Sequence, residues 1–130
     1  MRKVRVLIAD DHRGMRSTIV RVLSSEFKIV GVAGDGEELV DSAIALEPDV
    51  IVSDIYMPLL SGPGALKELG ARGYDIPFVL VSVDPYGIEE FLRQGAAAFV
   101  EKCDMGTELV PAVHSAALGC TSFSLAKSIN

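Results

Sequence analysis

The chain has 130 residues, the size of a single domain, and a domain of this length buries enough surface to form its own core. Hydrophobic residues make up 49% and charged residues 23%, a composition that excludes an intrinsically disordered chain. The formal net charge of −6 argues against nucleic-acid binding by this chain itself, because attraction to phosphate dominates such affinity. No apolar run approaches the roughly 18 residues that span a bilayer. No signal-peptide pattern is visible either, so we expect a cytoplasmic protein without a membrane partner.

Short apolar runs alternate with segments of helical periodicity five times along the chain. The runs are rich in Val, Ile and Ala, which is typical of strands buried on both faces of a sheet. Strands are therefore predicted at 4–9, 28–33, 50–53, 78–81 and 97–100.

Helical spacing fills the intervals between these runs. In the first interval the apolar face includes Ile19 and Leu23, and Arg16 lies off it. Asp35 to Glu38 resembles a capping box, and Pro63 and Pro85 suit the first turns of the third and fourth helices. Pro111 is awkward inside the fifth helix, so we expect that helix either to start near Thr107 or to kink.

Strict alternation of strand and helix predicts an α/β fold with a parallel five-stranded sheet and helices on both faces. Five such units fit a single doubly wound (βα)5 sandwich with right-handed crossovers. The strand order 2-1-3-4-5 is the one known for flavodoxin-like sheets, and we adopt it from that class of folds.

Polar residues stand where the predicted strands end. The first strand ends in Asp10 and Asp11, the third in Asp54 and the fourth in Ser82, while Lys102 follows the fifth. In open α/β sheets, ligands bind at the carboxyl ends of the strands, where the strand order reverses. Strands one and three flank that reversal, so we expect their aspartates to face each other.

Carboxylates packed together need a compensating cation, because two unit charges about 4 Å apart cost roughly 4 kcal/mol at an effective dielectric near 20. Oxygen ligands of this kind suit Mg²⁺, which could also neutralise charge during phosphoryl transfer. Asp54 is then a plausible nucleophile that forms an aspartyl-phosphate, and Lys102 and Ser82 supply a cation and a hydroxyl for the phosphoryl oxygens.

Each of these residues also has an ordinary structural explanation. An aspartate at a strand end most often caps a turn or a helix, and Asp11 could simply cap the first helix. A lone lysine is usually a solvated surface residue. The combination favours a site, because four complementary groups on one sheet edge are hard to obtain as independent caps.

Four segments carry a resemblance to a known family. They are 7–12 (Leu-Ile-Ala-Asp-Asp-His), 54–58 (Asp-Ile-Tyr-Met-Pro) with Gly62 after it, 79–82 (Val-Leu-Val-Ser) and 95–102 (Gly-Ala-Ala-Ala-Phe-Val-Glu-Lys). Together they resemble the receiver domain of two-component response regulators, over about residues 3–120. The Asp-Asp-His start and the stretch 102–109 are similar to the NarL/FixJ (LuxR-type) branch.

The resemblance implies a role for each site residue. Asp54 would be the phosphoacceptor, phosphorylated by a sensor histidine kinase or a small phosphodonor. Asp11 and Asp54 would ligate Mg²⁺, with Asp10 acting mainly through water and the Tyr56 backbone carbonyl completing the metal site. Ser82 and Phe99 would form the switch pair, which changes the surface of the fourth helix, fifth strand and fifth helix.

The resemblance also bears on domains and partners. We assign 1–120 to the receiver domain and 121–130 to a tail or the start of a linker. The branch usually carries a C-terminal DNA-binding domain, and nothing after Leu118 has such a pattern, so the chain is either a stand-alone receiver or one cut at a linker. A homodimer, or that output domain in the full-length protein, would receive the signal. Cys103 and Val83 depart from the usual family pattern beside the site.

Two other functions stay open. An Asp-nucleophile phosphatase generally has a second aspartate two residues after the nucleophile, where this chain has Tyr56. A degenerate, phosphate-independent interaction module is disfavoured by the complete set of site residues. We therefore expect a switch that is not an enzyme beyond its own phosphorylation and dephosphorylation. His12, His114 and Cys103 are interpreted as structural or surface residues.

Overall fold

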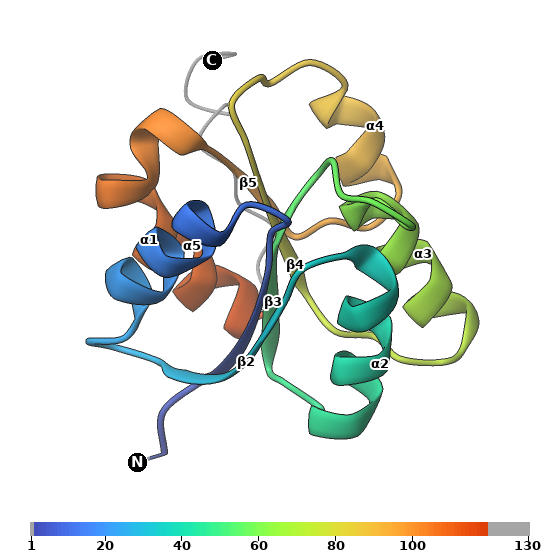
Figure 1. The fold of residues 1–130 in the computed structure, drawn as a ribbon, viewed down its shortest axis with the longest axis horizontal. Helices are drawn as coiled ribbons and strands as arrows, with labels where there is room; N and C mark the ends of the chain where they lie inside the picture. Colours follow the sequence, from blue (N-terminus) through green and yellow to red (C-terminus); the bar gives the residue numbers. More distant parts are fainter. Residues whose placement is uncertain (1, 120–130) are drawn as a thin grey trace.

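Five parallel strands form one sheet in a computed structural model that describes residues 2–119 (Figure 1). Their order is β2-β1-β3-β4-β5, so the predicted α/β fold and the flavodoxin-like order 2-1-3-4-5 are both confirmed. The strands are β1 (Arg5–Ala9), β2 (Lys28–Ala33), β3 (Val50–Asp54), β4 (Phe78–Ser82) and β5 (Ala98–Glu101).

Helices cover both faces of the sheet (Figure 1). One face is covered by α1 (Arg13–Leu23) and α5 (Met105–Ala117), and a short 3-10 turn, η1 (Lys102–Asp104), precedes α5. The other face is covered by α2 (Gly36–Leu46), α3 (Gly62–Ala71) and α4 (Ile88–Arg93).

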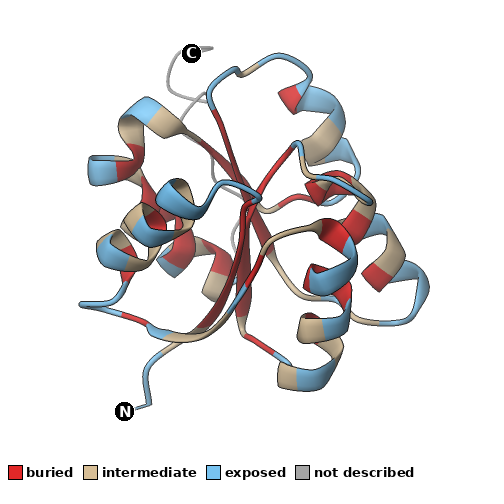
Figure 2. Ribbon diagram, in the orientation of Figure 1, coloured by how far each residue is buried: buried red, intermediate tan, exposed pale blue. Residues whose placement is uncertain are grey.

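The strand predictions succeed because the central strands are buried on both faces (Figure 2). Alternate residues of one strand point to different cores: Val6 and Ile8 pack with α1 and α5, whereas Leu7 and Ala9 pack with α2 and α3. Every residue of β3 and of β4 is buried, which explains why these strands are continuous apolar runs that end in a polar residue.

Side-chain caps begin three of the helices. The backbone N–H of Glu38 donates to Asp35 Oδ1 at 2.8 Å, and Glu38 returns a carboxylate oxygen to the N–H of Gly34, also at 2.8 Å. The predicted capping box is therefore present, with its return bond one residue before the cap. His12 caps α1 and Ser61 caps α3 in the same way.

One proline prediction was wrong, and of the two expectations for Pro111 one stays a prediction. Pro85 precedes α4 instead of lying in its first turn, because a turn closed by the Ile88 N–H and the Pro85 carbonyl delays the helix. Helix α5 begins at Met105, so Pro111 lies inside it rather than near its start, and the alternative expectation of a kink stays a prediction. Pro111 is exposed, and its ring therefore displaces none of the packing against the sheet.

The predicted tail at 121–130 lies outside the described residues. Among residues 2–119, none of the helices combines the length and the hydrophobicity that a bilayer crossing requires.

Candidate functional site

Three strands bring charged side chains to one edge of the sheet. Asp54 is the last residue of β3, and Asp10 and Asp11 directly follow β1, which pairs with β3. Lys102 follows β5, two strands away from β3. Because the strands are parallel, all their carboxyl ends meet at this edge.

The side chains of these residues form one cluster, which we call the acid pocket (Asp10, Asp11, Asp54 and Lys102). Carboxylate oxygens of the three aspartates lie within 4.8 Å of one another. Lys102 Nζ lies 3.4 Å from Asp10 Oδ2 and 3.4 Å from Asp54 Oδ2. The structure thus brings the acids and the lysine together as the sequence predicted, and the roles of the residues stay predictions.

The acids differ in exposure and in hydrogen bonding. Asp10 is fully buried, Asp54 is 8% exposed and Asp11 is exposed. Asp10 Oδ1 accepts from the His12 N–H at 2.8 Å, and Asp54 Oδ1 accepts from the Ile55 N–H at 2.8 Å. Asp10 Oδ2 is the one buried side-chain polar atom within residues 2–119 that lacks a hydrogen-bond partner.

This arrangement raises the pKa of Asp54 above its ordinary value of 3.8. Burial of the carboxyl is the largest cause and the nearby charge of Asp10 is the second, whereas Lys102 and the Ile55 N–H oppose the rise. In residues 2–119, Lys102 is the only cation within ion-pair distance of these acids, so the pocket has an excess of negative charge.

A divalent cation fits this excess. The three carboxylates offer only oxygen ligands, which Mg²⁺ prefers, and the unpartnered Asp10 Oδ2 is an acceptor that a cation or its water could satisfy. A second group, formed by Glu101, Cys103 and Asp104, does not fit Mg²⁺ as well. The pKa of its thiol is raised, chiefly by desolvation and by Asp104, so the thiol is a poor ligand and a poor nucleophile.

The remaining predicted residues lie beside the pocket. Asp54 pairs with Val81 across the two strands, so Ser82 lies one residue further toward the same edge. Ser82 is 2% exposed, and its hydroxyl accepts weakly from the Asp84 N–H at 3.4 Å. Phe99 is fully buried in the core under α3 and α4. The Tyr56 side chain is 65% exposed, and its backbone carbonyl belongs to the loop that follows Asp54.

Helix α3 closes the back of the pocket through glycine. The Gly62 N–H donates to the Ile55 carbonyl at 2.9 Å. A Cβ atom on Gly62 would lie only 2.3 Å from the Asp54 carbonyl oxygen, closer than atoms tolerate. The absence of a side chain therefore lets the helix pack directly on the backbone of Asp54.

Sequence reasoning missed two contacts around Asp10. Helix α1 is capped by His12, whose Nδ1 accepts from the Met15 N–H at 3.2 Å, and not by Asp11. Arg16 donates from Nη1 to the backbone carbonyl of Asp10 at 2.8 Å. The Asp-Asp-His order could have indicated the cap, but no pattern indicates a bond to a backbone carbonyl. His114 is exposed, as predicted, and pairs with Glu26 at 3.0 Å.

The fold and the acid pocket together define a class of protein. Residues 6–114 match the family model described as "Response regulator receiver domain", and the chain belongs to this family. It is a receiver domain of two-component response regulators, as the sequence predicted.

Similar proteins come from two kinds of regulator. The receiver domain of the putative response regulator NarL from Mycobacterium tuberculosis superposes with a TM-score of 0.86 and 34% identity, over 92% of this chain and 99% of that one. The probable transcriptional regulatory protein NarL of the same species is 37% identical over 123 residues, 90% of this chain and 56% of that protein.

The second kind is an enzyme. A protein-glutamate methylesterase/protein-glutamine glutaminase from Thermotoga maritima is 40% identical over 106 residues, 78% of this chain but 31% of that protein. The chain thus spans about half or less of these curated relatives. The similarity to NarL-type regulators agrees with the branch that the sequence indicated.

Proposed function

We propose that Asp54 accepts a phosphoryl group and that this receiver is a phosphorylation-dependent switch. The observation that carries the proposal is the position of Asp54, a nearly buried carboxylate with a lysine ammonium 3.4 Å away and two further aspartates around it. The lysine can contact a phosphoryl oxygen directly, and the further aspartates can do so only through a cation that they would hold.

The transfer would be a displacement at phosphorus. A carboxylate oxygen of Asp54 attacks the phosphorus of a phosphohistidine on a sensor histidine kinase. The P–N bond breaks, and its electron pair stays on the imidazole nitrogen. Lys102 and the Ser82 hydroxyl donate to the phosphoryl oxygens, which spreads the developing charge. An acyl phosphate on Asp54 is the product.

We propose Asp10, Asp11, Asp54 and the Tyr56 backbone carbonyl as the residues that would hold Mg²⁺. The ion, when bound, supplies positive charge against the phosphoryl oxygens and the crowded carboxylates. Asp10 is buried and accepts from a backbone N–H, so it contributes a fixed charge, while the exposed Asp11 can reach the ion directly.

Signalling would pass through Ser82 and Phe99. The Ser82 hydroxyl now accepts a long hydrogen bond of 3.4 Å, so little holds it away from a new acceptor on Asp54. Phe99 would repack as that hydroxyl moves, and the surface of α4, β5 and α5 would change for a homodimer or an output domain. A cytoplasmic location and a histidine kinase partner belong to the same proposal.

An enzymatic role is the weaker alternative. The phosphatase mechanism needs a general acid two residues after Asp54. Tyr56 stands there, with its side chain 65% exposed. The methylesterase relatives are far longer than this chain, so their catalytic activity is not proposed for it.

The test is phosphorylation by a small phosphodonor such as acetyl phosphate in the presence of Mg²⁺. The wild-type chain is expected to gain one phosphoryl group, detected by intact mass and removed by hydroxylamine, as an acyl phosphate should be. Asp54→Asn should gain none, whereas Asp41→Asn, the same change at an exposed position on α2, should be labelled like the wild type. Equal labelling of Asp54→Asn would refute the assignment.

A further inference from the structure

We propose that Arg16 is a positioning residue for the magnesium site and that it acts by holding the backbone of Asp10. This inference rests on the proposed function, because it concerns how the acid pocket is prepared for its cation. Arg16 does not touch the carboxylates within ion-pair distance, and its contact is with a main-chain carbonyl.

Asp10 is held at each of its polar groups except one. Its N–H donates to the Ala33 carbonyl at 3.1 Å, and its carbonyl accepts from Arg16 Nη1 at 2.8 Å. Its Oδ1 accepts from the His12 N–H at 2.8 Å. These bonds leave Oδ2 as the one oxygen without a hydrogen-bond partner, and it faces Lys102 across 3.4 Å.

Arg16 closes this set of bonds from a distance of six residues. Asp10 follows the last residue of β1, where its N–H still bonds to β2 but its carbonyl has, among the residues that the structure describes, no backbone donor from a neighbouring strand. The charged hydrogen bond from the first turns of α1 replaces the missing ladder bond. The Asp10 backbone is thereby fixed between β1 and α1, and this in turn fixes the direction in which its carboxylate points.

The Arg16 guanidinium also lies beside Gly34, in a third segment of the chain. A Cβ atom on Gly34, in the loop between β2 and α2, would lie 3.2 Å from Arg16 Nη1. That separation is tighter than most carbon contacts, so a Cβ atom at this position would require the guanidinium to shift by a few tenths of an ångström. Gly34 thus leaves the space that Arg16 needs to reach Asp10.

The two roles that Arg16 could have, a nearby positive charge or a positioning residue, predict opposite changes in Mg²⁺ affinity when it is removed. The direction of the change therefore tests the inference. If Arg16 acted only as a nearby positive charge, its removal would strengthen binding of a cation to the acid pocket. If Arg16 positions Asp10, its removal releases the Asp10 backbone and weakens binding. Loss of a residue that orients a ligand typically lowers metal affinity by about tenfold or more.

The experiment measures Mg²⁺ affinity by isothermal titration calorimetry on the metal-free chain, without a phosphodonor. Arg16→Ala is expected to bind Mg²⁺ about tenfold more weakly than the wild type. The matched control is Arg13→Ala, which removes the same charge from an exposed position in the first turn of α1. It should leave the affinity unchanged or slightly raised.

A double-mutant cycle separates positioning from general destabilisation. Gly34→Ala should weaken Mg²⁺ binding by a smaller factor in the wild-type chain, because it displaces the guanidinium. It should have no further effect in the Arg16→Ala chain, where nothing is left to displace. The Gly34→Ala single variant, which keeps Arg16, keeps the inference falsifiable if Arg16→Ala does not fold: unchanged Mg²⁺ affinity in that variant would overturn it.

The outcomes distinguish this inference from the proposed function. Absence of Mg²⁺ binding by the wild-type chain would overturn the metal site and the inference together. Wild-type binding with equal or tighter binding by Arg16→Ala would overturn the inference alone, and so would additive effects in the cycle. The proposed phosphorylation of Asp54 would survive both of those last results.

Discussion

The two edges of the sheet both carry acids, but they balance the charge differently. At the carboxyl edge, Lys102 stands against three aspartates and the pKa of Asp54 is raised, by burial first and by Asp10 second. At the amino edge, Asp49 accepts from the Arg5 N–H at 2.8 Å and pairs with Arg2 at 3.3 Å. Asp49 at the amino edge thus has a cation and a backbone donor within the chain, whereas the three aspartates at the carboxyl edge share one lysine.

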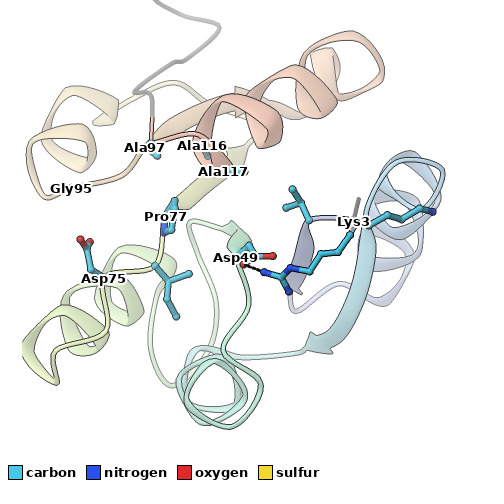
Figure 3. Close-up of a pocket in the computed structure, with 12 residues that line it drawn as sticks. Lys3, Asp49, Asp75, Pro77, Gly95, Ala97, Ala116 and Ala117 are labelled. Atoms are coloured by element: carbon cyan, nitrogen blue, oxygen red, sulfur yellow. Dashed lines mark hydrogen bonds and ion pairs between the residues drawn. The ribbon is translucent and has the colours of Figure 1, made fainter.

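A hollow also opens at the balanced, amino edge. A hollow of about 620 Å³ opens there between the start of the chain, the segment before β4 and the end of α5 (Figure 3). Asp75 and Pro77 line one side of it, and the small residues Ala116 and Ala117 line another. The comparison teaches that the two edges differ in unsatisfied charge, since the acid beside this hollow is paired within the chain and the acids of the carboxyl edge exceed their one lysine.

Removal of Lys102, the one lysine of the acid pocket, should give the largest effect on stability. Lys102→Ala leaves the two nearly buried carboxylates of Asp10 and Asp54 without a positively charged partner, which should cost about 3 kcal/mol of unfolding free energy in chelator at neutral pH. Added Mg²⁺ should restore part of that loss, because it supplies the missing charge. Urea unfolding followed by circular dichroism measures both. The control is Lys67→Ala, on the exposed side of α3. If Lys102→Ala loses no more unfolding free energy than this control, Lys102 does not offset an excess of negative charge in the acid pocket.

Removal of the Asp54 charge should raise the unfolding free energy, the opposite of the effect expected for Lys102→Ala. The pKa of Asp54 is raised in the folded chain, so between its ordinary value of 3.8 and the raised value the folded state binds more protons than the unfolded state. Stability in chelator should therefore fall as the pH rises through that window. Asp54→Asn should remove this dependence and stabilise the chain by about 1 kcal/mol at neutral pH. A steeper fall in the mutant would show that another group causes it.

The smallest effect is expected at the balanced edge. Arg2→Ala breaks an ion pair whose arginine side chain is 71% exposed, and such pairs contribute no more than about 0.5 kcal/mol. Mg²⁺ affinity in the same variant should not change, because the two edges are separated by the length of the sheet. A change in Mg²⁺ affinity, measured by titration calorimetry, would show that the edges are coupled.

The strands and the acid pocket could be predicted because simple rules control them. Runs such as 50–53 are apolar throughout since both faces of β3 are covered, and parallel strands bring Asp54 and Lys102 to one edge whatever the loops do. The start of α4 could not be predicted from Pro85 alone. Gly87 adopts a positive φ of 82°, and the turn around it takes up the residues that the helix was expected to use.

The contacts of Arg16 were beyond sequence reasoning for a different reason. On a helical wheel Arg16 lies off the apolar face of α1, which indicates only a solvated arginine. Its hydrogen bond goes to a main-chain carbonyl, and every residue has one, so no residue type identifies the partner. The space at Gly34 that admits the guanidinium depends on how β2 leaves the sheet, which only the assembled fold determines.

The contact between Gly62 and the Asp54 carbonyl limits how this domain can change. Residues that follow the ends of β3 and β4, such as Tyr56 and Val83, are exposed and can be exchanged without loss of core packing. Position 62 allows no such freedom, since the Cβ atom of any other residue would collide with the Asp54 carbonyl and force α3 and the end of β3 apart. The surroundings of Asp54 can therefore vary on the solvent side, while the side that faces α3 requires glycine.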